Sequence, residues 1–328
     1  MQELIQGFAN QLKEAMGIGE KAILFKPKAP IANVIVNGMG GSGIGGTIVS
    51  ELVSTKSKVP VYANKSYFLP EYAGENTLVI VDSYSGNTEE SVQALESALE
   101  AGAKVVCITS GGQIHDIARQ KKIDHITIPQ GFPPRAALGY SMVQIFYILY
   151  KFDIIDEYFL NDFDQAIRLL ENEEENIKSE AKRIASVLFG KTPVIYAPIR
   201  SEGVAVRFRQ ELNENAKMLA WHNMIPEMNH NEILGWSEKR DDLAVIFFRN
   251  DTDYSRIQKR VELTREVVLK YASRVVEIDS KGASMIERAI YQVHMGDWIS
   301  FFLAEMRKVD PNEIQTIEYL KSALAKSE

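Results

Sequence analysis

The sequence predicts an α/β protein built from two three-layer αβα sandwiches, each with a parallel sheet. Short β-branched runs alternate with stretches of helical periodicity in the first half, and the same alternation begins again after residue 190. Two loops rich in glycine or hydroxyl residues directly follow strands, as ligand-binding loops do at the carboxyl edge of a parallel sheet. Since 328 residues suit two domains of ordinary size, we expect domains over residues 1–152 and 153–328.

Five strands rich in Val, Ile or Thr are predicted in the first domain. They cover residues 34–36, 61–63, 77–81, 105–109 and 125–128. Helices are expected between them, including residues 89–101, and a helix over residues 136–151 completes the domain. This alternation is typical of a parallel sheet with helices on both faces.

The second domain repeats the pattern after a polar connection. Residues 153–190 predict one or two long helices, and strands are expected near residues 194–197, 243–248 and 275–278. A helix is predicted to begin near Val204. A terminal helix is expected from Asp310 onward, because Pro311 suits the first turn of a helix.

The composition excludes several classes of function. A formal charge of −7 without a dense Lys/Arg stripe argues against nucleic acid as a partner. No apolar run approaches the roughly 20 residues of a membrane span. The single cysteine, Cys107, can form no internal disulfide, so we expect a cytoplasmic protein. It lies in an apolar run, where burial raises the pKa of a thiol, and is therefore a poor candidate nucleophile.

The loop Ser83-Tyr84-Ser85-Gly86-Asn87-Thr88 predicts a phosphate site between a strand and a helix. The hydroxyls of Ser83, Ser85 and Thr88, exposed backbone N–H groups and the positive end of the helix can together satisfy anionic oxygens without a metal. Because the chain as a whole is acidic, we expect the phosphate of the substrate to be held locally by this loop.

A second loop, Gly38-Met39-Gly40-Gly41-Ser42-Gly43, matches the G-x-G-x-x-G pattern. A dinucleotide site would also need an acidic residue at the end of the next strand, but that strand ends in Asn64 and Lys65. Thr47 follows Gly46 directly, without the lysine that a Walker A motif has between them, so that motif is missing as well. We therefore expect no nucleotide cofactor, and purely structural glycines remain the alternative.

Two polar segments of the second half are candidates for chemistry. Asn213-Glu214-Asn215-Ala216-Lys217 lies in a predicted helix, and Pro226-Glu227-Met228-Asn229-His230-Asn231-Glu232 is too polar for a core strand. The density of polar partners makes His230 the strongest candidate among the histidines. The structural alternative for Glu214 is an ion pair with Lys217 or Arg207 on a helix face.

With these four motifs, the sequence resembles the bifunctional phosphoglucose/phosphomannose isomerases of the sugar isomerase (SIS) domain family. The likeness extends from the first strand to Asp310-Pro311 and the C-terminal lysine. The resemblance implies two SIS domains per chain and a homodimer. It also implies interconversion of glucose 6-phosphate or mannose 6-phosphate with fructose 6-phosphate through a cis-enediol, with neither a metal nor another cofactor.

The resemblance also implies roles for individual residues. Ser83, Ser85 and Thr88 would bind phosphate, and Gly41 and Ser42 would contact the substrate nearby. Glu214 would be the catalytic base, Arg135 the stabiliser of the enediolate, His230 the ring-opening residue supplied by the neighbouring subunit, and Lys321 a lysine near the sugar.

Two other functions would share the phosphate loops. A phosphosugar etherase or lyase would use the same cradle, and a sugar-phosphate sensor would bind its ligand without turnover. The sequence shows no zinc-ligand spacing such as H-x-x-x-H or clustered cysteines, so we expect the electrophile to be organic. Arg135, which follows Pro133-Pro134, suits that role because a fixed guanidinium stabilises negative charge on oxygen.

Overall fold

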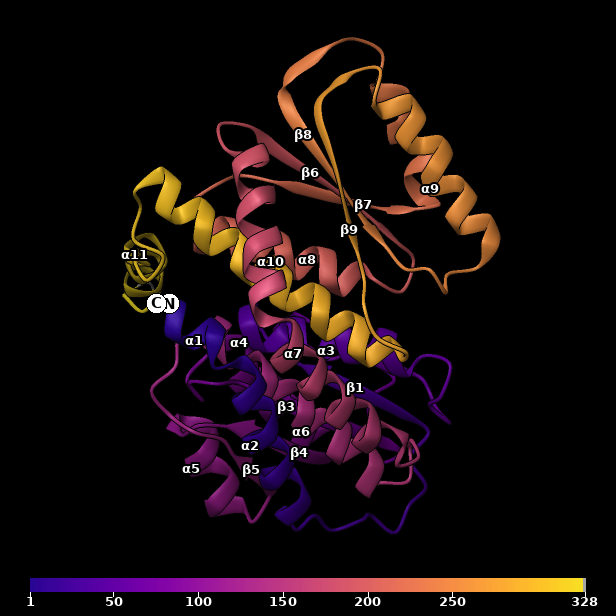
Figure 1. The fold of residues 1–328 in the computed structure, drawn as a ribbon. Helices are drawn as coiled ribbons and strands as arrows, with labels where there is room; N and C mark the ends of the chain where they lie inside the picture. The colour runs from indigo at the N-terminus through magenta and orange to yellow at the C-terminus, as the bar shows by residue number, and fades with distance from the viewer. Residues whose placement is uncertain (327–328) are drawn as a thin grey trace.

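The computed structural model describes residues 1–326, which fold into two parallel sheets with helices between them (Figure 1). The first sheet has the strand order β2-β1-β3-β4-β5 and the second has the order β7-β6-β8-β9. The strands are β1 (Asn33–Asn37), β2 (Val61–Asn64), β3 (Thr77–Asp82), β4 (Lys104–Thr109), β5 (Asp124–Thr127), β6 (Thr192–Pro198), β7 (Trp221–Ile225), β8 (Arg240–Arg249) and β9 (Ala272–Asp279). The predicted fold class of two α/β sandwiches with parallel sheets is confirmed.

Helices cover both faces of each sheet. They are α1 (Gln2–Gln6), α2 (Phe8–Lys21), α3 (Gly40–Val53), α4 (Glu89–Glu100), α5 (Gly112–Lys121), α6 (Leu138–Lys151), α7 (Tyr158–Leu188), α8 (Glu202–Glu214), α9 (Ser255–Val268), α10 (Met285–Arg307) and α11 (Gln315–Leu324). Short 3₁₀ turns are η1 (Pro134–Ala137), η2 (Glu227–His230) and η3 (Glu232–Gly235). Within residues 1–326, no helix combines the length and apolar character needed to cross a membrane.

The strands divide their side chains between two hydrophobic layers. Along β3, Leu78 and Ile80 face the space between the sheets, whereas Val79 and Val81 face α4 and α5. This alternation is the period of two expected of a strand. Cys107 belongs to the outer layer, and burial raises the pKa of its thiol to about 12, which confirms that it is a poor nucleophile.

One continuous core fills the space between the sheets. It contains strand residues of both sheets together with the apolar faces of α2, α3, α6, α7, α8 and α10. The long helix α7 packs against α2 of the first half and α10 of the second. The domain boundary at residue 152 stays a prediction, since the helix that follows it belongs to both halves.

The prediction of one or two long helices after residue 153 is confirmed, since residues 158–188 form one uninterrupted helix. The structure corrects the predicted elements at two other points. Strand β7 was not predicted, because Trp221, His222 and Asn223 break the apolar pattern at the edge of the second sheet. The terminal helix begins at Gln315 rather than at Pro311, because residues 311 and 312 form a turn and residues 313 and 314 are not helical.

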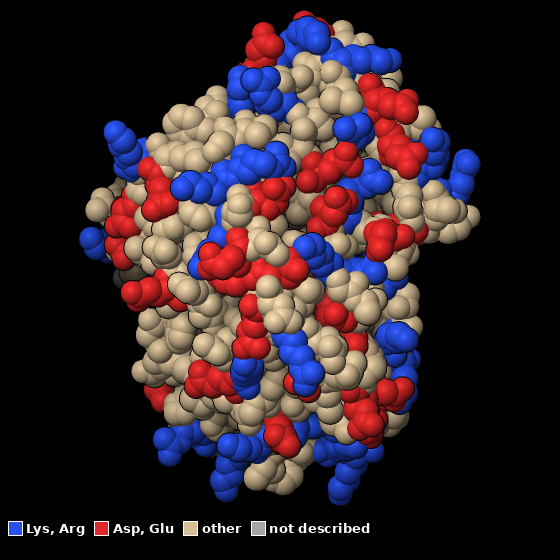
Figure 2. All heavy atoms as spheres, viewed as in Figure 1, with Lys and Arg blue, Asp and Glu red and all other residues tan. Residues whose placement is uncertain are grey.

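Charged side chains of both signs are mixed over most of the face shown in Figure 2. The expectation that nucleic acid is not a partner stays a prediction.

The two halves meet closely where α8 begins on α3. The backbone N–H of Gly203 donates to both carboxylate oxygens of Glu51 at 3.0 and 3.1 Å. A Cβ atom on Gly203 would lie 2.8 Å from Cγ1 and 3.0 Å from Cα of Ile48, which is closer than packed atoms allow. Glycine at this position therefore permits the two helices to touch.

We expect Gly203→Ala to lower the free energy of unfolding by about 1–3 kcal/mol, because the added methyl overpacks a junction bounded by backbone. Gly17→Ala is the matched control: it lies in α2, and nothing is within 4 Å of its Cβ position. That control should stabilise the protein by about 0.5–1 kcal/mol through helix propensity. Urea unfolding measures both, and equal effects of the two substitutions would contradict the close junction.

Candidate active site

The hydroxyl-rich loop connects β3 to α4 at the carboxyl edge of the first sheet. Ser83 is buried, and its Oγ donates to Thr88 Oγ1 at 3.3 Å. Ser85 is exposed, and its Oγ accepts from the backbone N–H of Asn87 at 3.2 Å. Thr88 is the residue before the first turn of α4, so the loop lies at a helix N-terminus, where an anion is favoured.

The glycine-rich loop lies beside it and begins α3. The Oγ of Ser42 accepts from the backbone N–H of Tyr84 at 3.1 Å, which joins the two loops. A Cβ atom on Gly41 would lie 2.7 Å from the carbonyl oxygen of Pro134 and 2.9 Å from the backbone nitrogen of Arg135. Only glycine lets α3 begin this close to the segment that carries Arg135.

A carboxylate that the sequence analysis overlooked lies directly behind the loops. Asp82 ends β3, is fully buried, and accepts from Ser141 Oγ at 3.2 Å. Burial raises the pKa of Asp82 to about 7, although hydrogen bonds from Ser141 and Ser42 act in the opposite direction. Its Oδ2 has no hydrogen-bond partner among residues 1–326. The only signal in the sequence was an acidic residue at the end of an apolar strand.

The Arg135 side chain is buried and contacts three residues in two segments. Its Nε donates to Asn215 Oδ1 at 2.9 Å, its Nη1 lies 3.4 Å from Glu214 Oε2, and its Nη2 donates to the carbonyl oxygen of Pro311. Arg135 follows β5 of the first half, whereas Glu214 and Asn215 lie at the end of α8. This guanidinium therefore brings the first sheet and the end of α8 to one place.

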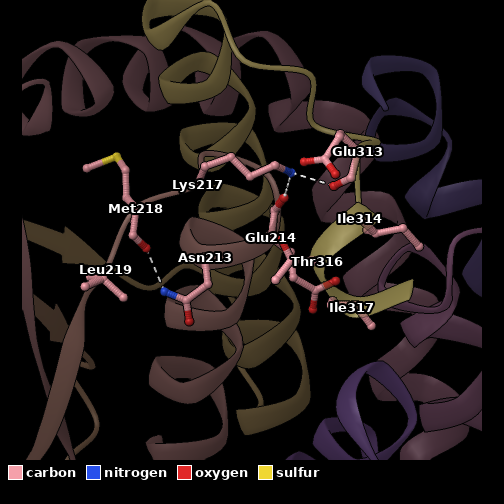
Figure 3. A pocket seen from close by; sticks show the side chains of 9 residues that line it. All are labelled: Asn213, Glu214, Lys217, Met218, Leu219, Glu313, Ile314, Thr316 and Ile317. Atoms are coloured by element: carbon pink, nitrogen blue, oxygen red, sulfur yellow. Dashed lines mark hydrogen bonds between the residues drawn. The ribbon is translucent and has the colours of Figure 1, made fainter. Parts of the chain in front are cut away.

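Glu214 lies in the wall of a pocket of about 350 Å³. The pocket is lined by Asn213, Glu214, Lys217, Met218, Leu219, Glu313, Ile314, Thr316 and Ile317 (Figure 3). Figure 3 shows Lys217 reaching between Glu214 and Glu313; its Nζ donates to the backbone carbonyl oxygens of both. Burial, followed by the nearby charge of Arg135, lowers the pKa of Lys217.

The structural alternative for Glu214 is wrong. Lys217 contacts the backbone of Glu214 and not its carboxylate. Arg207 pairs instead with Glu211 at 2.9 Å and with Asp297 at 3.1 Å. The charged partner of the Glu214 carboxylate is Arg135, 79 positions away in the sequence. Lys217 itself was present in the quoted motif, but its place in the pocket was not predicted.

A series of contacts connects the hydroxyl loop with Glu214. Ser42 binds the backbone of Tyr84, the neighbouring Gly41 touches the backbone of Arg135, and the Arg135 guanidinium reaches Glu214. The hydroxyl loop, the glycine-rich loop and the Arg135–Glu214 pair are thus joined by consecutive contacts. This arrangement suits a phosphorylated substrate whose reacting atoms develop negative charge.

His230 and Lys321 are not part of this arrangement within one chain. Met228, two residues before His230, packs in the apolar layer on the outer face of the second sheet, whereas α8 packs on the inner face. His230 and Glu214 thus belong to elements on opposite faces of that sheet. Lys321 is exposed on α11, where none of residues 315–324 is buried, although Thr316 and Ile317 of the same helix line the pocket.

The side chains of residues 1–326 form no group of three or more His, Cys, Asp or Glu residues that could hold a metal ion. The expected independence of metal stays a prediction.

Comparison with known proteins identifies both halves of the chain. The family model of the SIS domain matches residues 31–141, and that of the bacterial phospho-glucose isomerase C-terminal SIS domain matches residues 177–324. In fold, a hypothetical protein from Thermus thermophilus is similar with a TM-score of 0.78 and 16% identity, covering 98% of this chain and 90% of its own.

Full-length relatives agree with these matches. The bifunctional phosphoglucose/phosphomannose isomerase of Caldicellulosiruptor bescii is 34% identical over 337 residues and covers 99% of each chain. The protein of the same name from Aquifex aeolicus is 32% identical and covers 99% of this chain and 98% of its own. The chain therefore belongs to the bifunctional phosphoglucose/phosphomannose isomerase family of SIS-domain proteins.

Proposed function

We propose that the protein interconverts glucose 6-phosphate and mannose 6-phosphate with fructose 6-phosphate. The observation that carries this proposal is the pairing of Glu214 with the buried guanidinium of Arg135 in a pocket wall, linked by contacts to the hydroxyl loop. The names of the full-length relatives support the same reaction.

In this reaction, Glu214 is the base that moves one proton between two carbon atoms. Starting from the aldose, the carboxylate removes the proton from C2; the C–H electron pair forms a C1=C2 double bond, and the carbonyl pair moves to O1. After O1 takes up a proton, Glu214 returns its proton to C1, and the O2 hydroxyl loses a proton to give the ketone. One carboxylate can thus serve both positions.

Arg135 stabilises the negative charge that develops on the enediolate oxygens. Its side chain is almost fully shielded from water, and a fixed cation in such a site is worth more than one in solvent. Gly41 holds the backbone of Arg135 against the start of α3, and the guanidinium lies beside the carboxylate of Glu214. Ser83, Ser85 and Thr88 bind the phosphate, with Gly41 and Ser42 next to the sugar.

We also propose a cytoplasmic homodimer in which His230 of one subunit opens the sugar ring in the site of the other. An imidazole suits this step because it can donate or accept a proton near pH 7. The placement of η2 and α8 on opposite faces of the second sheet supports a role across an interface. Lys321 contacts the sugar only if α11 moves or if the bound sugar phosphate extends as far as Lys321.

A phosphosugar lyase would share the phosphate loops, and a sensor would need those loops alone. The pairing of a carboxylate with a buried arginine favours isomerisation, since a sensor has no use for a proton acceptor beside a cation. A coupled assay on fructose 6-phosphate distinguishes these functions, because a sensor binds the sugar phosphate without turnover.

Glu214→Gln should lower kcat about 10²–10⁴-fold, because the amide keeps the size of the side chain but cannot accept the carbon-bound proton. The measurement is kcat with fructose 6-phosphate and with mannose 6-phosphate, and both should fall together. Glu238→Gln, at an exposed carboxylate, is the control and should retain wild-type turnover. Normal turnover of Glu214→Gln would exclude it as the base.

Ser85→Ala should chiefly raise KM, because one hydrogen bond to a charged phosphate oxygen contributes about 1.5–3 kcal/mol. Ser83→Ala should raise KM as well and also lose the hydrogen bond to Thr88. Ser186→Ala is a matched control, since its exposed hydroxyl donates only to the Lys182 carbonyl in α7. Steady-state kinetics that leave KM unchanged in both loop variants would remove this loop from the substrate site.

Mixing Glu214→Gln and His230→Ala subunits should restore part of the lost activity. Each hybrid dimer would contain one site with an intact base and an intact histidine if His230 acts across the interface. Native mass spectrometry first establishes that subunits have exchanged, and the coupled assay then measures turnover. Exchange without recovered activity would show that His230 does not act in the partner's site.

A further inference from the structure

The Arg135 guanidinium is held from behind by a side chain that does not line the pocket. Asn215 is fully buried, and its Oδ1 accepts from Arg135 Nε at 2.9 Å. Pocket residues include Glu214 and Lys217 but not Asn215. Any influence of Asn215 on the reaction must therefore pass through its neighbours.

The orientation of the Asn215 amide is fixed by two further contacts. Its Nδ2 donates to Glu211 Oε2 at 2.7 Å and to Ser300 Oγ at 3.0 Å. The Ser300 hydroxyl donates to the carbonyl oxygen of Asp297, which leaves an oxygen lone pair for the amide. With both of its N–H groups engaged, the amide has its oxygen directed at Arg135.

The partners of Asn215 are themselves anchored in the core. Glu211 pairs with Arg207 at 2.9 Å, and Arg207 reaches Asp297 on α10 at 3.1 Å. All three side chains are almost completely buried, so their mutual contacts replace those with water. Asn215 is therefore the member of a rigid network between α8 and α10 that faces Arg135.

We propose that Asn215 is a positioning residue that sets the direction of the Arg135 guanidinium toward the reacting oxygens. The proposal rests on the role of Arg135 given above. Arg135 Nη1 and Nη2 contact Glu214 and the Pro311 carbonyl at the rim of the site, whereas Nε is tied to the protein core. The hydrogen bond from Nε to Asn215 fixes the orientation of the guanidinium plane. Misplacement of such a group by about 1 Å can lower the rate on the order of 10²-fold.

The test uses Asn215→Leu, which has a similar volume but no acceptor for Nε. We expect kcat on fructose 6-phosphate to fall about 10–100-fold while KM stays near the wild-type value, because the phosphate loop is separate from this network. Asn215→Asp keeps the acceptor and should recover much of kcat. The new carboxyl and Glu211 can share a proton, since burial raises the pKa of Glu211.

A double-mutant cycle separates positioning from a general loss of stability. Arg135→Lys has no Nε–H at this point, so Asn215→Leu should lower kcat no further in that background. Urea unfolding of each variant shows that it is folded under assay conditions. If Asn215→Leu does not fold, Asn215→Ala, which adds no bulk, takes its place in the cycle.

The outcomes distinguish the inference from the function it rests on. Wild-type kcat in Arg135→Lys would exclude both the role of Arg135 and the positioning role of Asn215. A large loss in Arg135→Lys with normal kcat in Asn215→Leu would overturn the positioning role alone. Additive losses in the double variant, or no recovery in Asn215→Asp, would also overturn it.

Discussion

A buried guanidinium must have partners for its donors, and Arg135 obtains them from parts of the chain that only this fold brings together. Its three contacts reach Glu214, Asn215 and the turn at Pro311, while its backbone lies against Gly41. The first sheet, the end of α8 and the C-terminal turn are thus constrained by one side chain. The same constraint places the Glu214 carboxylate beside a buried cation whose backbone lies against the start of α3.

Most elements could be predicted from the local sequence, because the spacing of apolar residues in a strand or an amphipathic helix indicates which of its faces is buried. Strand β7 could not, since it is an edge strand whose first residues, Trp221 and His222, remain partly accessible. The start of α11 was misplaced because Pro311 and Glu313 offer their carbonyl oxygens to Arg135 and Lys217 instead of entering a helix. Tertiary contacts decided both cases.

The candidate site shows the same division. The hydroxyl loop is contiguous in sequence, so its position between a strand and a helix could be predicted from a motif. Arg135 and Glu214 are 79 positions apart in the sequence, so no spacing could indicate their contact. The contacts of Asn215 and Lys217 depend on the path of the chain as it leaves the C-terminal end of α8. The separation of His230 from Glu214 likewise requires knowledge of which face of the second sheet each element covers.

The core shared by the two sheets has a mechanical consequence. Helix α7, with 31 residues and a length of about 47 Å at 1.5 Å per residue, ties both halves into one stiff frame. A hinge between the sheets would expose that core to water, so substrate entry by opening the halves is strongly disfavoured. Helix α11 borders the pocket and has no buried residue among residues 315–324, so lifting it uncovers little apolar surface. Helix α11 is therefore the border of the pocket that can move with the least loss of buried apolar surface.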